Sequence, residues 1–313
     1  MSRKQSKPTN NSAKQSAKQS ATADAKRTKR PNSYVRFGLS DRIEHLLLLT
    51  SFTVLGLTGV PQMFVGTTWG ITLINLMGGI EFIRIVHRTA AVVLMLETIY
   101  HGGTVTYKVF VKRVRMTMLP GWKDVTDAFQ SLMYNVGFSK DAPKMGRYNY
   151  GEKVEYWAVI WGTLVMVVTG FMLWNPIATT NFLPGQVVPV AKAAHGGEAL
   201  LAVLSIIIWH MYHVHIKGFN RSMFTGRISR HDMEEEHALE LEEIEAGTAS
   251  RPVDPASVRR RRLIFLPVAV VISVTLLTGL YFFVTYEQTA ITTIPRQPVE
   301  IFVPAADPAE GVQ

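Results

Sequence analysis

Two long apolar stretches of this 313-residue sequence begin and end on histidine: HRTAAVVLMLETIYH at 87 to 101, and HGGEALLAVLSIIIWH at 195 to 210. An imidazole is costly inside hydrocarbon, so four of them at these positions indicate a compensating interaction. Since an α-helix rises about 1.5 Å per residue, each pair of histidines spans about 21 to 22 Å. The second imidazole of each pair returns to within roughly 60° of the first. The four side chains therefore form candidate ligand pairs at two matching depths.

The absence of cysteine narrows the chemistry of these pairs. Without cysteine the chain cannot form disulfides, hold a thiolate-bound iron-sulfur cluster or attach a c-type haem covalently. Zinc prefers about four tetrahedral ligands at one site, and two imidazoles at each depth leave such a site incomplete. A b-type haem iron accepts one neutral imidazole on each side. The histidines therefore predict two b-type haems with bis-histidine ligation.

Five apolar blocks are long enough to cross a bilayer, since about 20 helical residues cover roughly 30 Å of hydrocarbon. They lie near residues 43 to 65, 83 to 111, 152 to 175, 191 to 216 and 263 to 285. The 47% of residues that are hydrophobic are gathered into these blocks, which is typical of membrane helices. We therefore expect an all-α integral membrane bundle, with a four-helix di-haem core and a fifth C-terminal transmembrane helix.

Basic residues in the links between blocks predict the orientation. The link 66 to 82 has no Lys or Arg, and the link 175 to 190 has no charged residue. The link 112 to 151 carries seven basic residues, and the run RRRR at 259 to 262 precedes the fifth block. We expect a multi-pass protein of the cytoplasmic (inner) membrane, with its N-terminus in the cytoplasm and its C-terminus outside.

The blocks divide the chain into five parts. We expect a disordered basic cytoplasmic tail (1–35), a haem-binding membrane domain (36–230), an acidic cytoplasmic linker (231–262), the fifth transmembrane helix (263–285) and an extracytoplasmic tail (286–313). Within the linker, residues 231 to 248 have the composition of a solvated acidic helix. The basic tail is too polar to fold alone. It lacks stacking or groove-reading motifs, so we expect it to contact anionic membrane lipid and no nucleic acid.

Charged residues inside the apolar blocks are further candidates. Arg88 follows His87 at the outer level, where we expect it to neutralise a haem propionate rather than only mark the end of the helix. Glu97 and Glu198 lie within apolar sequence. An unpaired carboxylate is expensive there, so each is expected to have a hydrogen-bonding or proton-transfer partner.

Four segments carry a family resemblance: RFGLSDRIEHLLLLTSFTVLGLTGVPQMF at 36 to 64, IVHRTAAVV at 85 to 93, GRYNYGEKVEYWAVIWGTLVMVVTGFMLW at 146 to 174, and IKGFNRSMFTG at 216 to 226. GRYNYGEK is the most specific of them. Over about residues 34 to 237 the chain resembles the membrane cytochrome b (gamma) subunits of respiratory formate dehydrogenase and related cytochrome b partners of nickel-iron hydrogenase. The resemblance implies a four-helix bundle whose two b haems pass electrons between an extracytoplasmic redox subunit and quinone. It does not account for the fifth helix or the long tails.

The resemblance also implies ligands. By position in the family motifs, the outer haem would use His87 and His195, and the inner haem would use His45 and His210. The spacing argument instead offers His101 as the partner of His210, as in the cytochrome b of quinol-oxidising bc-type complexes. The sequence leaves both alternatives for the inner haem open.

Further roles remain for the other histidines. A third haem between His213 and either His45 or His101 is one alternative. Quinone is expected beside the inner haem, with His213, His101 or Glu97 as a proton relay. The expected function is that of the quinone-reactive electron-transfer subunit of a respiratory oxidoreductase complex. Its extracytoplasmic partner would be a multihaem cytochrome c, an iron-sulfur protein or a molybdopterin protein.

Two other classes of function compete with this reading. A transporter or channel could use a polar His/Glu pathway, and it would show no haem absorption. An anchor or assembly subunit would tolerate alanine at the membrane histidines.

Overall fold

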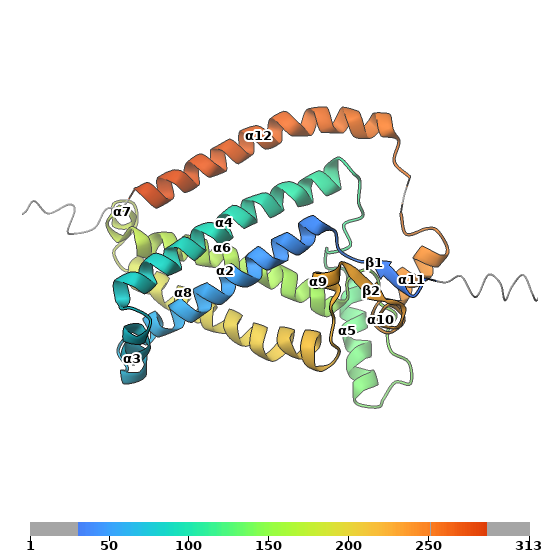
Figure 1. Ribbon diagram of the computed structural model, residues 1–313, viewed down its shortest axis with the longest axis horizontal. Helices are drawn as coiled ribbons and strands as arrows, with labels where there is room; N and C mark the ends of the chain where they lie inside the picture. Colours follow the sequence, from blue (N-terminus) through green and yellow to red (C-terminus); the bar gives the residue numbers. More distant parts are fainter. Residues whose placement is uncertain (1–30, 251, 287–313) are drawn as a thin grey trace, which may run out of the picture.

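The bundle has two different ends. The computed structural model describes residues 31 to 250 and 252 to 286. The long helices run in roughly the same direction (Figure 1), and short helices α3 (Thr68–Leu76) and α7 (Pro176–Thr180) lie at one end, called the α3 end. A small antiparallel sheet of β1 (Ser33–Val35) and β2 (Arg227–Ser229) lies at the other, called the sheet end.

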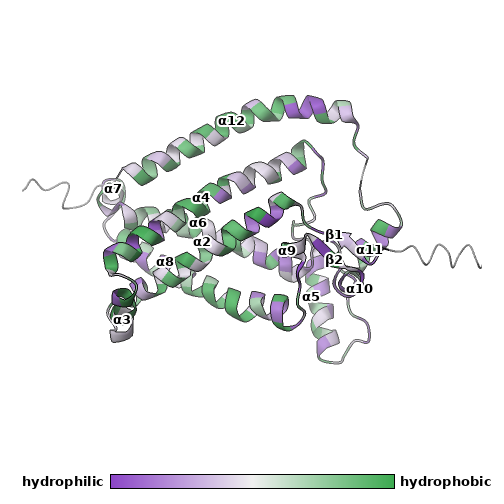
Figure 2. Cartoon of the chain, in the orientation of Figure 1, coloured by the Kyte–Doolittle hydropathy of each residue, from purple (hydrophilic) through white to green (hydrophobic). Residues whose placement is uncertain are grey.

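The long helices confirm the expected all-α membrane bundle. They are α2 (Leu39–Met63), α4 (Ile80–Phe110), α6 (Tyr150–Trp174), α8 (Val187–Ser205) and α12 (Pro255–Thr285). Among the described residues, four helical stretches are long and apolar enough to cross a membrane: α2, α6, α12 and the continuous stretch Val187–Ile216 that begins with α8. The expected block at 83 to 111 falls in α4, which has 31 residues but carries more charge. Hydrophobic residues dominate the long helices, whereas hydrophilic residues gather at the sheet end (Figure 2).

The helices pack as two neighbouring pairs, α2 with α4 and α6 with α8. Helix α2 also contacts α8, and this contact joins the two pairs, while α12 packs against α4.

Local signals set where the helices begin. The side chain of Asn149 accepts from the backbone N–H of Glu152 at 2.8 Å, and the Glu152 carboxylate accepts from the Asn149 N–H at 2.8 Å. This capping box starts α6 within the GRYNYGEK motif.

The fourth membrane stretch ends in π-helix. Helix α8 continues into η1 (Ile206–His210) and η2 (Tyr212–Ile216). The spacing argument assumed an uninterrupted α-helix from His195 to His210. The wider π turns change the angular position of His210 relative to His195, and such turns occur frequently at functional sites.

The sheet end differs from the sequence expectation in two ways. The basic tail was expected to extend to residue 35, but Ser33, Tyr34 and Val35 form β1 and pair with β2. The acidic segment was expected to be a solvated linker. Instead it forms α10 (Arg230–Glu236) and α11 (Ala238–Glu245), which fold onto the sheet. The local core consists of Tyr34, Ile228, Met233 and Leu241. The acidic composition did not indicate this core, because only a few apolar side chains anchor the two helices.

The small sheet together with α10 and α11 is called here the cap. A buried polar cluster joins the cap to the bundle. Arg36, only 3% exposed, donates to Glu240 at 2.7 Å, and Arg147 donates to the other oxygen of the same carboxylate at 2.8 Å. His237 is fully buried, and its Nδ1 lies 2.9 Å from the carbonyl oxygen of Gly146. The GRYNYGEK motif therefore anchors the cap, because Gly146 and Arg147 belong to it.

Candidate haem sites

Two pairs of histidines face each other inside the bundle. The ring centroids of His87 on α4 and His195 on α8 lie 6.4 Å apart, near the α3 end. Those of His45 on α2 and His210 in η1 lie 6.5 Å apart, near the sheet end. An imidazole nitrogen bound to a first-row metal lies about 2 Å from it, so two imidazoles on opposite sides of one iron have ring centres roughly 6 Å apart. Both pairs have the spacing that a bis-histidine haem requires.

Thr58 on α2 fixes the tautomer of His87. The Thr58 hydroxyl donates to the carbonyl oxygen of Val54 at 2.6 Å. Its oxygen also lies 2.9 Å from Nδ1 of His87. Because the hydroxyl hydrogen is already used, the imidazole donates from Nδ1 and keeps the Nε2 lone pair free. A free Nε2 is what axial ligation of a haem iron needs.

Thr169 on α6 does the same for His195. Its hydroxyl donates to the carbonyl oxygen of Val165 at 2.6 Å and accepts from Nδ1 of His195 at 2.9 Å. The two facing histidines therefore have equivalent hydrogen bonds from neighbouring helices. In both His87 and His195, Nε2 is left unprotonated.

Glycines follow both threonines and give the rings room. A Cβ atom at Gly59 would lie 3.1 Å from Cε1 of His87, and one at Gly170 would lie 3.4 Å from Cε1 of His195. A Thr-Gly dipeptide thus contacts each histidine of the pair: the threonine orients the ring, and the glycine lets the helix approach it closely. Sequence reasoning missed this device, although LTG at 57 to 59 and VTG at 168 to 170 were a readable signal.

Glu155 is the corresponding partner of His210. Its Oε2 lies 2.8 Å from Nδ1 of His210, from the neighbouring helix α6. An ionised carboxylate only accepts hydrogen bonds, so His210 donates from Nδ1 and leaves Nε2 free, as in the other pair. Glu155 was another residue that the sequence analysis did not identify.

His101 lies elsewhere, and both of its nitrogens are occupied. Nδ1 lies 2.7 Å from Oε2 of Glu44, and Nε2 lies 3.1 Å from the hydroxyl of Tyr156. Its ring packs against that of Tyr156 in a tilted arrangement, with centroids 5.9 Å apart and an angle of 59° between the planes. The structure therefore places His45, and not His101, opposite His210. Helical spacing could not show that the His101 ring contacts side chains of α2 and α6.

Glu97 lies beside His101 in a compact polar group. One ligand atom from each of Glu44, Glu97 and His101 lies within 4.8 Å of the others. Glu97 is 9% exposed and Glu44 is 6% exposed. Ser40 donates to the second oxygen of Glu44 at 2.6 Å, which extends the group toward the start of α2. Glu44 and His101 are therefore the partners expected for the buried carboxylate of Glu97. The three side chains together are suited to sharing a proton or holding a cation.

The two remaining candidates, His213 and Glu198, contact residues of their own helix or of a neighbouring helix. Nδ1 of His213 lies 2.9 Å from the carbonyl oxygen of Trp209, and its ring packs on the Trp209 indole with centroids 4.3 Å apart. In the part of the chain that the structure describes, no ring contact joins His213 to another histidine. Glu198 packs against α6, where a Cβ at Gly162 would come 2.7 Å from its Oε1.

Polar donors lie at the α3 end near the first pair. The guanidinium of Arg88, which follows His87, lies 4.4 Å from the centre of the Trp174 indole ring. The buried Nε1 of Trp174 has no hydrogen-bond partner among the described residues. A cation and an unsatisfied N–H at the end of the bundle fit the acidic propionates of a haem.

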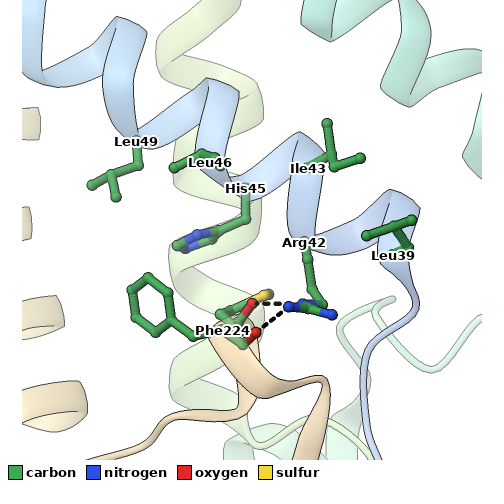
Figure 3. Close-up of a pocket in the computed structure, with 8 residues that line it drawn as sticks. Leu39, Arg42, Ile43, His45, Leu46, Leu49 and Phe224 are labelled. Carbon is green, nitrogen blue, oxygen red and sulfur yellow. Dashed lines mark hydrogen bonds between the residues drawn. The ribbon is translucent and has the colours of Figure 1, made fainter.

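A mainly apolar pocket lies beside His45. Figure 3 shows the His45 ring pointing from α2 toward Phe224, with Leu46 and Leu49 along the same helix. Arg42 forms the polar edge and donates to the carbonyl oxygens of Met223 and Phe224. An apolar cavity with an imidazole at its wall fits the edge of a porphyrin ring.

Known proteins of similar sequence point the same way. No family model matches the chain. The chain is 26% identical over 218 residues to the cytochrome b556(Fdn) subunit of the nitrate-inducible formate dehydrogenase of Escherichia coli K12, covering 69% of this chain and 94% of that subunit. It is 24% identical to the cytochrome b556(fdo) subunit of formate dehydrogenase from the same organism, covering 71% and 99%. With the cytochrome b556 subunit of Haemophilus influenzae formate dehydrogenase it shares 22% identity, covering 62% and 76%. These alignments support the resemblance that the motifs carry: the chain is similar in sequence to cytochrome b556 subunits of formate dehydrogenase.

Proposed function

We propose that the chain is the di-haem cytochrome b subunit of a respiratory oxidoreductase complex and carries electrons through the membrane. The observation that supports this most strongly is the pair of facing histidines at each end of the bundle, at 6.4 and 6.5 Å. A bound haem supplies a one-electron iron couple, while the protein tunes it through ligands, hydrogen bonds and burial.

The residues take defined roles in this proposal. His87 and His195 hold the haem at the α3 end, and His45 and His210 hold the haem at the sheet end. Thr58, Thr169 and Glu155 keep three of these imidazoles in the tautomer that presents Nε2. Arg88 and Trp174 receive the propionates of the first haem.

The two sites together connect the ends of the bundle. His195 and His210 are fifteen residues apart, which corresponds to roughly 20 Å along a helix. That distance is a large part of the roughly 30 Å hydrocarbon thickness. Two haems in series would therefore pass electrons from one membrane surface to the other.

The electron donor and acceptor follow from the relatives and the polarity of the ends. The relatives are named as subunits of formate dehydrogenase, so we propose that this chain assembles with the catalytic subunits of a complex of that kind. The redox partner binds at the α3 end, outside the cytoplasm. Quinone binds near the sheet-end haem, where protons enter from the cytoplasm. His101, which is hydrogen-bonded at both ring nitrogens, is favoured as the relay over His213, whose Nδ1 bonds only a carbonyl of its own helix.

An optical spectrum of the protein purified from membranes tests this proposal. We expect the reduced spectrum of a b-type haem and a ratio of two haems per chain by pyridine haemochromogen assay. Comparison with the four single alanine variants of the proposed ligands serves as the control. A purified, folded protein without haem absorption would contradict the proposal and favour a transporter or an anchor.

A further inference from the structure

Helix α5 (Trp122–Asn135) turns its apolar side away from the protein. The side chains of Trp122, Val125, Phe129 and Leu132 recur at helical spacing, and Val136 continues the series. All five are exposed, from 54% for Leu132 and Val136 to 80% for Trp122. At about 100° per residue they fall within roughly 80° of arc. They form a continuous apolar surface, called here the α5 stripe.

The charged side of α5 is fixed to the protein. Asp124 forms an ion pair with Lys153 at 2.7 Å, and both side chains are largely buried. Asp127 is 8% exposed, and Lys123 binds it at 2.6 Å. Lys123 also donates to the carbonyl oxygen of Lys144 at 3.0 Å. From the centre of the α5 stripe, Asp124 lies about 120° and Asp127 about 180° around the helix. These contacts hold the helix with its stripe outward.

This arrangement is the reverse of a helix packed on a soluble protein, whose apolar side faces the core. An exposed apolar surface of this kind marks a site of contact with a protein partner or with the membrane. Helix α5 lies in the link between α4 and α6, at the sheet end, where those helices leave the bundle. Figure 1 shows that it runs across the direction of the long helices. A helix placed crosswise at the end of membrane spans lies along the bilayer surface.

The charges around α5 match the headgroup layer of an anionic membrane. Lys112, Arg113 and Lys140 are exposed and belong to the same link. Within the described ranges, none of these three side chains forms an ion pair with the protein. By contrast, Arg115 and Lys144 pair with Glu243 and Glu242 of the cap. Cations beside an apolar helix face are typical of helices that lie in the interface and contact lipid phosphates.

We propose that α5 is an interfacial helix: the α5 stripe enters the boundary between headgroups and acyl chains, and Lys112, Arg113 and Lys140 contact the phosphates of anionic lipids. Trp122 at its start lies where tryptophan anchors membrane proteins. The inference concerns the lipid contact of the link and does not depend on haem or on electron transfer.

Single-cysteine labelling tests this directly, because the 313-residue sequence has no cysteine. A spin label at Phe129→Cys reports the stripe. The matched control is Gln130→Cys, one residue away and about 100° around the helix. The proteins are reconstituted in phosphatidylcholine vesicles with and without phosphatidylglycerol. Collision rates with oxygen and with a water-soluble nickel chelate then give the depth of each label.

We expect the Phe129→Cys label to collide mainly with oxygen and the Gln130→Cys label mainly with nickel. Val125→Cys, also on the stripe, provides a second reading if Phe129→Cys does not reconstitute. The stripe labels should lie deeper when phosphatidylglycerol is present, and Lys112→Gln with Lys140→Gln should remove that difference. Equal nickel access for both labels would overturn the proposal. Shielding from both reagents would assign the stripe to a protein neighbour, and a depth independent of phosphatidylglycerol would overturn the phosphate contacts.

Discussion

The oxygen of the Thr58 hydroxyl on α2 lies 2.9 Å from Nδ1 of His87 on α4, while its hydrogen is donated to the carbonyl of Val54. Thr169 on α6 has the same relationship with His195 on α8, at the same 2.9 Å. The first histidine pair is thus oriented by two equivalent hydrogen bonds from the neighbouring helices. This equivalence makes the role of each threonine measurable.

Replacing Thr58 with valine should weaken the first haem site without removing it. Loss of a partner that orients a metal-bound histidine typically lowers affinity by about 10-fold or more. The less basic imidazole should also stabilise ferric iron less, so we expect a more positive midpoint potential for one haem. Haem titration and redox potentiometry measure both effects.

Thr98→Val is the matched control for this variant. The Thr98 hydroxyl is exposed and donates to its own helix at the carbonyl of Leu94, at 2.8 Å. Equal effects of Thr58→Val and Thr98→Val would show that the hydrogen bond to His87 does not tune the haem.

His87→Ala and His195→Ala should each remove the same haem. The two rings face each other at 6.4 Å, and loss of either imidazole leaves the iron held on one side only. Both variants should drop to one haem per chain with identical remaining spectra and potentials. If the two variants retain different haems, the pairing is wrong.

His45→Ala and His101→Ala should differ. His45 faces His210, whereas His101 is bound at both nitrogens by Glu44 and Tyr156. We expect His45→Ala to lose the sheet-end haem and His101→Ala to keep two haems per chain while quinone reduction slows. Loss of that haem in His101→Ala, with both haems retained in His45→Ala, would favour the ligand set based on spacing.

Acid should loosen the cap at the sheet end through His237. Burial and the nearby charge of Arg36 lower the pKa of His237 from 6.5 to about 4. In the unfolded chain this histidine gains a proton below pH 6.5, whereas in the folded cap it stays neutral until about pH 4. The free energy of unfolding is therefore highest above pH 6.5 and decreases as the pH falls toward 4, by about 3 kcal/mol in total.

Hydrogen exchange of α10 and α11 between pH 7 and pH 5, corrected for the intrinsic rates, would measure this loss. His237→Asn should reduce the pH dependence, because an amide does not gain a proton in this pH range. The asparagine side chain can still donate to the carbonyl oxygen of Gly146 and accept from Arg36. His231→Asn is the control, because His231 is 76% exposed. A pH dependence that is unchanged in His237→Asn would assign the effect to other groups.

The basic links predict that the sheet end faces the cytoplasm. In intact cells a membrane-impermeant maleimide should label Gln186→Cys, in the link before α8, and leave Lys140→Cys unlabelled until the membrane is opened. Both positions are exposed, so their labelling depends on the side of the membrane. Labelling of Lys140→Cys alone would reverse the orientation.

The sequence by itself determined which segments span the membrane and which cofactor chemistry the histidines can support. Runs of apolar residues predict spans without knowledge of any contact, and the lack of cysteine excludes covalent c-type haem and thiolate clusters. The matching intervals from His87 and from His195 predict two depths, and the structure has a facing histidine pair near each end of the bundle. Helical periodicity gives the depth and the face of a side chain, and these depend only on neighbours along the chain.

Only the tertiary structure decided which side chains meet. His45 faces His210 across 165 positions of sequence, while His101 turns to Glu44 and Tyr156. The packing of α2 on α4 and of α6 on α8 brings the Thr-Gly dipeptides against the rings. The acidic segment folds because its apolar side chains pack on Tyr34 of β1, and because the Glu240 carboxylate accepts from Arg36, just after β1, and from Arg147 in the link before α6. Such contacts join residues that are distant in sequence, so periodicity and composition carry no information about them.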